Sequence, residues 1–141
     1  MQAKALMIFE EDLLDPGFNS WIESQNLRPL HRFEGLIELG SRFLEFSGND
    51  KRTNSNYKFK VFLEEITDVY YGWDRVFGAS QNYSNLATLR PLRISFGNEK
   101  EEKNVYFFIG LNNVIHTTKN LQWFNELKSM ARKKVEKEEE N

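Results

Sequence analysis

The chain has 141 residues, with no cysteine and only two histidines, His31 and His116. The absence of cysteine excludes a disulfide framework, thiolate zinc sites and cysteine nucleophiles. No apolar run approaches the roughly 20 residues of a membrane-spanning helix. The short apolar run Ala5–Phe9 is followed at once by acidic residues, unlike the longer apolar region of a secretory signal. We therefore expect a cytoplasmic protein.

Features that would mark an enzyme, a metal site or a nucleic-acid site are also scarce. The 8 glycines never occur in a phosphate-binding order, and the net charge of −2 supplies no positive groove for nucleic acid. The two histidines lack the spacing of a metal motif, and no G-x-S-x-G turn is present. Pairing of a histidine with Ser41, Asp68 or Glu65 stays open, because catalytic triads assemble from distant residues. We predict a non-enzyme without metal, cofactor or nucleic-acid partner.

What the chain does contain is apolar and aromatic: 40% of its residues are hydrophobic and 12 are phenylalanines. This composition argues against disorder and favours β-structure. Six segments alternate apolar and polar residues with a period of two, as half-buried strands do. They are Phe33–Leu39, Arg42–Ser47, Tyr57–Glu64, Glu65–Trp73, Arg90–Gly97 and Asn104–Gly110. Without β-α-β alternation, they predict an antiparallel β-barrel or sandwich.

The connections between these strands differ in length. Gly40-Ser41 predicts a tight hairpin, and residues 48–56 predict a long polar turn. Residues 98–103 predict a charged turn, and residues 74–89 lose the strand pattern and are expected to be mostly loop. The N-terminal run Ala5–Phe9 fits either an edge strand or the first turn of a helix, since a short apolar run cannot be assigned by periodicity. We expect residues 1–31 to form a partly helical N-terminal extension packed on the core.

The C-terminal segment changes to the helical period. After Thr117 and Thr118, either of which can cap a helix, apolar residues recur every three or four positions at Leu121, Phe124 and Leu127, and then at Met130 or Ala131. This single apolar stripe predicts a helix that closes the open end of the barrel. Residues 132–141 are almost wholly charged and predict a disordered or fraying tail. The predicted organisation is an extension over 1–31, a domain over 32–131 and a tail over 132–141.

Strand hairpins followed by one amphipathic helix with Trp123 near its start resemble a pleckstrin-homology (PH) superfold domain, closest to the GRAM and bacterial PH-like branch. FEGLIELGSRFLEFSG resembles the first hairpin of GRAM domains, KVFLEEITDVYYG their next two strands, and LRISFG with VYFFIG their closing hairpin. The resemblance covers Phe33 to Met130 and implies a PH-like barrel that serves as a binding or scaffolding module. Phosphoinositide-binding PH domains carry a basic motif in a roomy first loop, whereas this chain has only Gly40-Ser41 and Arg42 there.

Two surfaces are candidates for binding. The first is an exposed strand edge, or the space between a strand and the C-terminal helix, where a protein or peptide can dock. The second is the basic hairpin, which comprises Lys51, Arg52, Lys58 and Lys60 and could hold an anionic lipid headgroup. Lysines on an exposed strand also prevent edge pairing, which gives this cluster an ordinary explanation. A barrel that binds a small apolar ligand is a third possibility. We predict a protein or peptide partner first.

Overall fold

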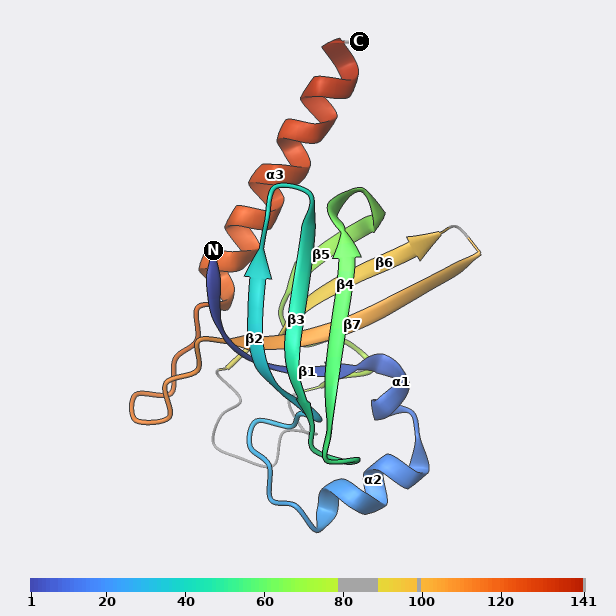
Figure 1. Ribbon diagram of the computed structural model, residues 1–141, viewed down its shortest axis with the longest axis vertical. Helices are drawn as coiled ribbons and strands as arrows, with labels where there is room; N and C mark the ends of the chain where they lie inside the picture. The colour runs from blue at the N-terminus through green and yellow to red at the C-terminus, as the bar shows by residue number, and fades with distance from the viewer. Residues whose placement is uncertain (79–88, 99, 141) are drawn as a thin grey trace.

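Seven antiparallel strands form one sheet in the order β4-β3-β2-β1-β7-β6-β5 (Figure 1). The computed structural model describes residues 1–78, 89–98 and 100–140, with side chains of the last helix described to Ala131. In chain order the strands are β1 (Gln2–Phe9), β2 (Phe33–Leu39), β3 (Phe43–Asp50), β4 (Ser55–Phe62), β5 (Ile66–Tyr71), β6 (Leu92–Asn98) and β7 (Glu101–Ile109). The sheet curls into a half-barrel, and α3 (Asn120–Glu140) packs on β5, β6 and β7. This confirms the predicted antiparallel β class with one C-terminal helix.

β1 lies in the middle of the sheet, hydrogen-bonded to β2 on one side and to β7 on the other. It is therefore neither the edge strand nor the helical turn that the sequence allows, and it belongs to the sheet rather than to an extension packed on it. The physical reason is burial on both faces: Met7 and Ile8 are adjacent and both fully buried. A strand covered on both faces has no polar alternation that would identify it. The helical part of residues 1–31 consists of α1 (Glu10–Leu13) and α2 (Pro16–Glu23).

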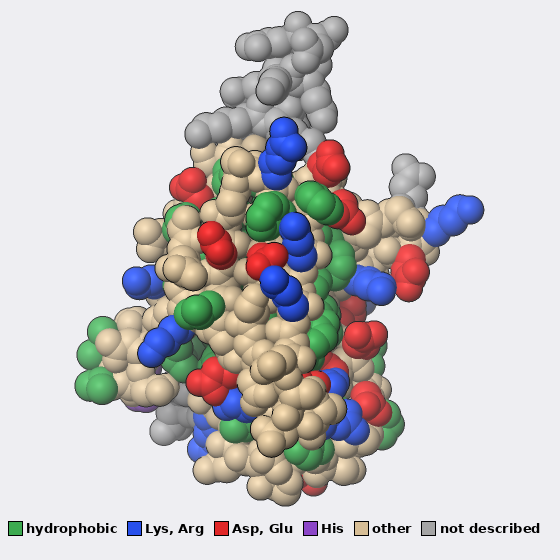
Figure 2. Space-filling view, in the orientation of Figure 1, with side chains coloured by type: hydrophobic (Ala, Val, Ile, Leu, Met, Phe, Trp, Pro, Cys, Tyr) green, Lys and Arg blue, Asp and Glu red, His purple; other side chains and the backbone are tan. Residues whose placement is uncertain are grey.

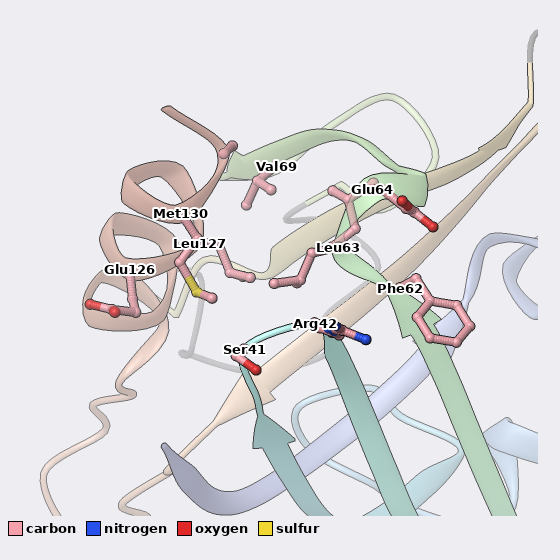
Figure 3. Close-up of a pocket in the computed structure, with 11 residues that line it drawn as sticks. Ser41, Arg42, Phe62, Leu63, Glu64, Val69, Glu126, Leu127 and Met130 are labelled. Carbon is pink, nitrogen blue, oxygen red and sulfur yellow. The ribbon is translucent and has the colours of Figure 1, made fainter. Parts of the chain in front are cut away.

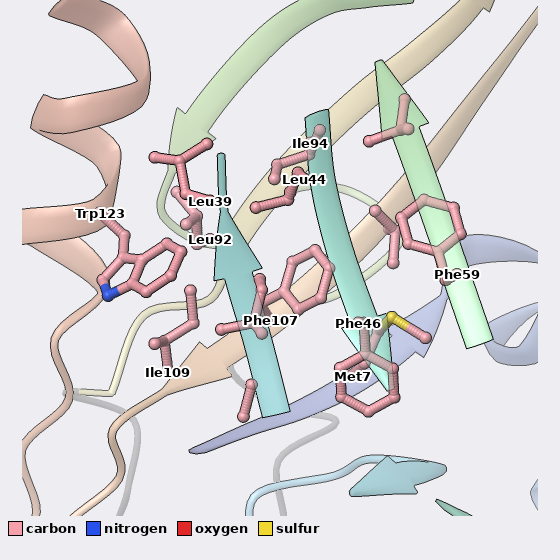
Figure 4. Close-up of a cluster of buried hydrophobic side chains, with 14 of the residues drawn as sticks. Met7, Leu39, Leu44, Phe46, Phe59, Leu92, Ile94, Phe107, Ile109 and Trp123 are labelled. Carbon is pink, nitrogen blue, oxygen red and sulfur yellow. The ribbon is translucent and has the colours of Figure 1, made fainter. Parts of the chain in front are cut away.

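Two apolar clusters lie on opposite faces of β1 and β7. The inner cluster fills the curl of the sheet, and Figure 4 shows Trp123 pointing from α3 towards Leu92 and Ile109 within it. The outer cluster joins β1 and β7 to α1, α2 and the segment around Phe77. All five residues of Val105–Ile109 consequently have no exposed surface. The predicted alternation of β7 describes one face correctly, but its other face is buried as well.

The turns are shorter than the sequence predicts. β3 extends to Asp50 and β4 begins at Ser55, so the turn between them is Lys51–Asn54 rather than 48–56. The β6–β7 connection is likewise shorter than 98–103, because β6 ends at Asn98 and β7 begins at Glu101. The tight turn predicted at Gly40-Ser41 is confirmed by a 2.9 Å hydrogen bond from the Gly40 N–H to the Phe43 carbonyl. Of the predicted loop 74–89, residues 79–88 lie outside the described part of the chain.

A pair of glycines allows β2 and β3 to come close together. Gly35 and Gly48 lie directly opposite each other in the register of the two strands. A Cβ at Gly35 would collide with the backbone carbonyl of Ser47, and a Cβ at Gly48 with that of Glu34. Only glycine fits where two backbones approach this closely.

The start of α3 is fixed to the sheet by the buried side chain of Asn120. Its Oδ1 accepts the Ile109 N–H at 2.8 Å, and its Nδ2 donates to the carbonyls of Phe107 at 3.0 Å and Arg90 at 2.8 Å. Thr118, one of the two expected caps, accepts the Asn120 N–H at 3.3 Å. This polar anchor sets which face of α3 turns inward.

The inward face of α3 carries Asn120, Trp123 and Leu127, which lie three and four positions apart. Leu121 is 53% exposed, so the prediction that it helps to close the barrel is wrong. Trp123 takes that place, because burial of Asn120 rotates Leu121 out of the apolar stripe. The helix continues to Glu140, through most of the segment 132–141 that the charge pattern predicts as a tail.

We expect Asn120→Ala to reduce the free energy of unfolding by about 2–4 kcal/mol, because it leaves one buried N–H and two carbonyls without their partner. The matched control is Asn125→Ala, which removes an exposed amide from the same helix and is expected to change stability by less than about 0.5 kcal/mol. Urea unfolding followed by circular dichroism measures both. Equal stability of the two variants would contradict the anchoring role of Asn120.

Candidate functional site

The four cations of the basic hairpin each have a partner within the protein. Lys51 donates to Glu34 at 2.7 Å, and Arg52 to Asp15 of the α2 N-terminus at 3.1 Å. On β4, Lys58 lies 3.5 Å from Glu45 across the β3–β4 pair. The Lys60 ammonium sits 4.0 Å from the centre of the Phe43 ring.

These partners spread the charge of the hairpin. Figure 2 shows basic and acidic side chains interspersed over the face that carries β2, β3 and β4, without a patch of one sign. Lys51 and Arg52 belong to the turn, whereas Lys58 and Lys60 stand on the exposed side of β4. The four residues therefore do not form one cradle of unpaired cations.

A neighbouring ion-pair network ties the N-terminal helices to the sheet. Arg32 donates to Asp12 at 2.6 Å and to Asp50 at 2.8 Å, and both carboxylates are almost fully buried. Burial alone would raise the pKa of Asp50, but the hydrogen bonds from Arg32 and from the Arg52 N–H lower it below the usual range. The charges near the β3–β4 turn thus act mainly within the fold.

His31 is buried in the same region. Its Nδ1 lies 2.6 Å from the Pro29 carbonyl, and its Nε2 lies 2.9 Å from the Lys51 ammonium. A carbonyl can only accept, and an ammonium can only donate, so the geometry fits a neutral ring with its proton on Nδ1. Burial lowers the pKa of His31 from 6.5 to about 4, and the nearby charge of Lys51 acts in the same direction. His31 is a structural residue, and His116 is exposed in the loop between β7 and α3.

A recess lies at the open end of the half-barrel, between β5 and α3 (Figure 3). We call it the α3–β5 groove, and its volume is about 770 Å³. Its lining comes from the β2–β3 turn, the β4–β5 connection, β5 and α3, and consists of Ser41, Arg42, Phe62, Leu63, Glu64, Ile66, Val69, Glu126, Leu127, Met130 and Ala131. In Figure 3, Leu63, Val69, Leu127 and Met130 point into the space between these elements.

The groove combines an apolar floor with a charged rim. Leu63 and Ile66 are half-buried, and the exposed side chains of Arg42, Glu64 and Glu126 border them. β5 is an end strand of the sheet and, among the described strands, pairs with β6 alone. The groove therefore offers apolar contact beside one edge of a strand, which is the chemistry that an extended peptide can use.

The groove holds no arrangement that indicates catalysis. Ser41 lines it, but neither histidine does. Asp68 instead pairs with Arg93 at 3.0 Å, and Glu65 accepts the Phe62 N–H at 3.1 Å. Across the described residues, no three potential ligands converge on a metal position. Within that same part of the chain, no helix is long and apolar enough to cross a membrane.

Sequence reasoning identifies only part of this groove. Ile66 and Val69 are expected to be buried at the start of their strand, and Leu127 and Met130 belong to the predicted apolar stripe. The contributions of Ser41, Arg42 and Phe62 depend on how the sheet curls, which alternation does not encode. The 43% exposure of Phe62 follows the alternation of β4, which puts it on the same side as the exposed Lys58 and Lys60.

Comparison with protein-family models gives no match to this chain, and comparison with curated proteins gives none either.

The depressed pKa of His31 predicts a pH-dependent stability. The unfolded chain takes up the proton near pH 6.5 and the folded chain only near pH 4, so the free energy of unfolding should fall as the pH drops through this window. The fall can reach about 3 kcal/mol. The carboxylates with lowered pKa values, such as Asp50 and Asp74, act at lower pH.

Urea titrations at several pH values within this window measure the slope. His31→Gln should flatten it even if the variant is less stable at every pH, because the titrating group is gone. His116→Gln removes the exposed histidine and should keep the wild-type slope. A wild-type slope in the His31 variant would show that another group is responsible.

Proposed function

We propose that this protein is a non-catalytic PH-like binding module whose α3–β5 groove docks an extended segment of a protein partner. The observation that carries the proposal is the groove itself, an open recess with an apolar floor beside an end strand. A peptide lying there can add backbone hydrogen bonds along β5 and place apolar side chains against Ile66, Val69 and Leu127.

The architecture supports the PH-like part of the proposal. One curled antiparallel sheet of seven strands is followed by a single C-terminal helix that closes the core, with Trp123 1% exposed. A fold of this kind hosts many functions, so the function is argued from the groove.

The alternatives have less support. Anionic lipid binding by Lys51, Arg52, Lys58 and Lys60 would have to compete with the partners that each of them already has. Binding of a small apolar ligand inside the barrel would need interior space. The centre of the curl is instead filled by large side chains that are at most 1% exposed, among them Phe46, Phe107 and Trp123.

The groove can be blocked without disturbing the core, because Ala131 is exposed and lines it. Peptides selected from a random display library on the wild-type protein supply the probe. We expect Ala131→Glu to weaken their binding at least about tenfold, since it places a charge and added bulk on the apolar floor. Ser129→Glu is the matched control, because it adds the same charge at an exposed position of α3 that does not line the groove.

Fluorescence anisotropy of the labelled peptides gives the affinities, and thermal unfolding checks that both variants fold. Equal binding to wild type and Ala131→Glu would place the docking site elsewhere. Failure of any peptide to be enriched on the wild-type protein would count against a peptide-binding function.

A further inference from the structure

A loop between β7 and α3 carries two exposed aliphatic side chains. Val114 is 87% exposed and Ile115 is 65% exposed. The loop projects from the side of the barrel in Figure 1, and Figure 2 shows hydrophobic side chains at its end. Exposure of two adjacent aliphatic residues at one projecting tip calls for a partner of matching chemistry.

The loop is held in shape by its own hydrogen bonds. Asn112 and Thr117 exchange backbone hydrogen bonds of 2.8 and 3.3 Å at its base. The Asn112 side chain accepts the N–H groups of Val114 at 3.0 Å and Ile115 at 3.3 Å. With these backbone groups paired within the loop, the tip is ready to enter an apolar layer at lower cost.

Two exposed cations, Lys4 and Arg28, lie beside the loop, and we call them the cationic shoulder. A recess of about 660 Å³ runs over the outer face of β1 and β2, and Asn113 of the loop lines it together with Lys4 and Arg28. Glu34 and Lys51 line it as well and pair with each other at 2.7 Å. Both cations are exposed, and neither forms an ion pair with any described residue. Leu36, which is 45% exposed, lines the same recess.

The sequence around the loop is free of negative charge. No aspartate or glutamate occurs between Lys103 and Glu126, although the whole chain has a net charge of −2. Lys119 follows the loop directly. The aliphatic tip thus lies beside a recess that carries Lys4 and Arg28, and the one acidic residue named in its lining, Glu34, is paired with Lys51. This arrangement complements the interface of a bilayer that contains anionic lipids.

We propose that the Val114–Ile115 tip inserts into the interfacial layer of an anionic membrane, while Lys4 and Arg28 face the lipid phosphates. A protein partner fits less well, because a stable interface buries about 800 Å² on each side, far more than two side chains on a narrow loop can supply. This surface is separate from the α3–β5 groove and meets the basic hairpin at Lys51, which lines the same recess and is paired with Glu34. The inference does not depend on the proposed function.

Co-sedimentation with vesicles of phosphatidylcholine, with and without phosphatidylserine, tests the inference. The wild-type protein should bind the anionic vesicles and bind the neutral ones more weakly. Val114→Ser with Ile115→Ser should reduce binding to anionic vesicles at least about tenfold. Leu14→Ser is the matched control, since Leu14 is 66% exposed between α1 and α2 and should be dispensable for binding.

The cationic shoulder has a control of its own. Lys4→Ser with Arg28→Ser should reduce the preference for anionic vesicles, whereas Lys58→Ser with Lys60→Ser, which removes two exposed cations from β4, should not. Because the chain has no cysteine, Val114→Cys can carry a single environment-sensitive fluorophore. Its emission should shift to the blue on anionic vesicles, and the same label at Leu14→Cys should not respond.

The inference is overturned if the wild-type protein does not bind anionic vesicles or if the Val114–Ile115 double variant binds them equally well. Loss of binding in the Lys58–Lys60 variant alone would assign the membrane contact to the basic hairpin instead. If sedimentation velocity finds a dimer that the Val114–Ile115 variant dissociates, the tip binds a second copy of this chain, and the membrane role is wrong. Ala131→Glu should leave vesicle binding unchanged, so this test is independent of the groove.

Discussion

The side chain of Asn120 connects α3 to the sheet, and the position of α3 at the open end of the half-barrel depends on this connection. One buried amide pairs with the end of β7 and with the Arg90 carbonyl, which precedes β6. Because these hydrogen bonds are directional, they fix the rotation of α3 about its own axis more strictly than apolar packing alone. Trp123 and Leu127 then face the core. The helical wall of the α3–β5 groove lies where that rotation puts it.

The two candidate surfaces differ because the two faces of the sheet are covered differently. The inner face is closed by α3, which leaves a groove where the curl remains open beside β5. The outer face is covered by the short helices and the segment around Phe77, and the recess lined by Lys4 and Arg28 lies over β1 and β2. A peptide and a membrane would therefore contact separate parts of the molecule, and binding of one need not exclude the other.

The sequence predicts the six strands from β2 to β7 but leaves the N-terminal run that forms β1 open between a strand and a helical turn. Alternation identifies β2 through buried Phe33, Ile37 and Leu39, with Glu34 and Glu38 exposed on the other face, but β1 offers only an apolar run. The helix is found from its period, yet its phase is misjudged at Leu121, since a buried asparagine does not look like a core residue. The groove depends on how the whole sheet curves, and the tip depends on the exposure of the Val114 and Ile115 side chains. Neither is a local property of the sequence.

The central position of β1 also bears on how the protein folds during synthesis. β1 pairs with β2 early, but its other edge is completed only by β7, about 100 residues later in translation. Until then a nascent chain on the ribosome presents an apolar strand with one side unpaired, a state that invites association with other chains. Closure of the sheet is thus a late event that joins the first and last strands. A chaperone that binds apolar strands would therefore protect the nascent chain most during this interval.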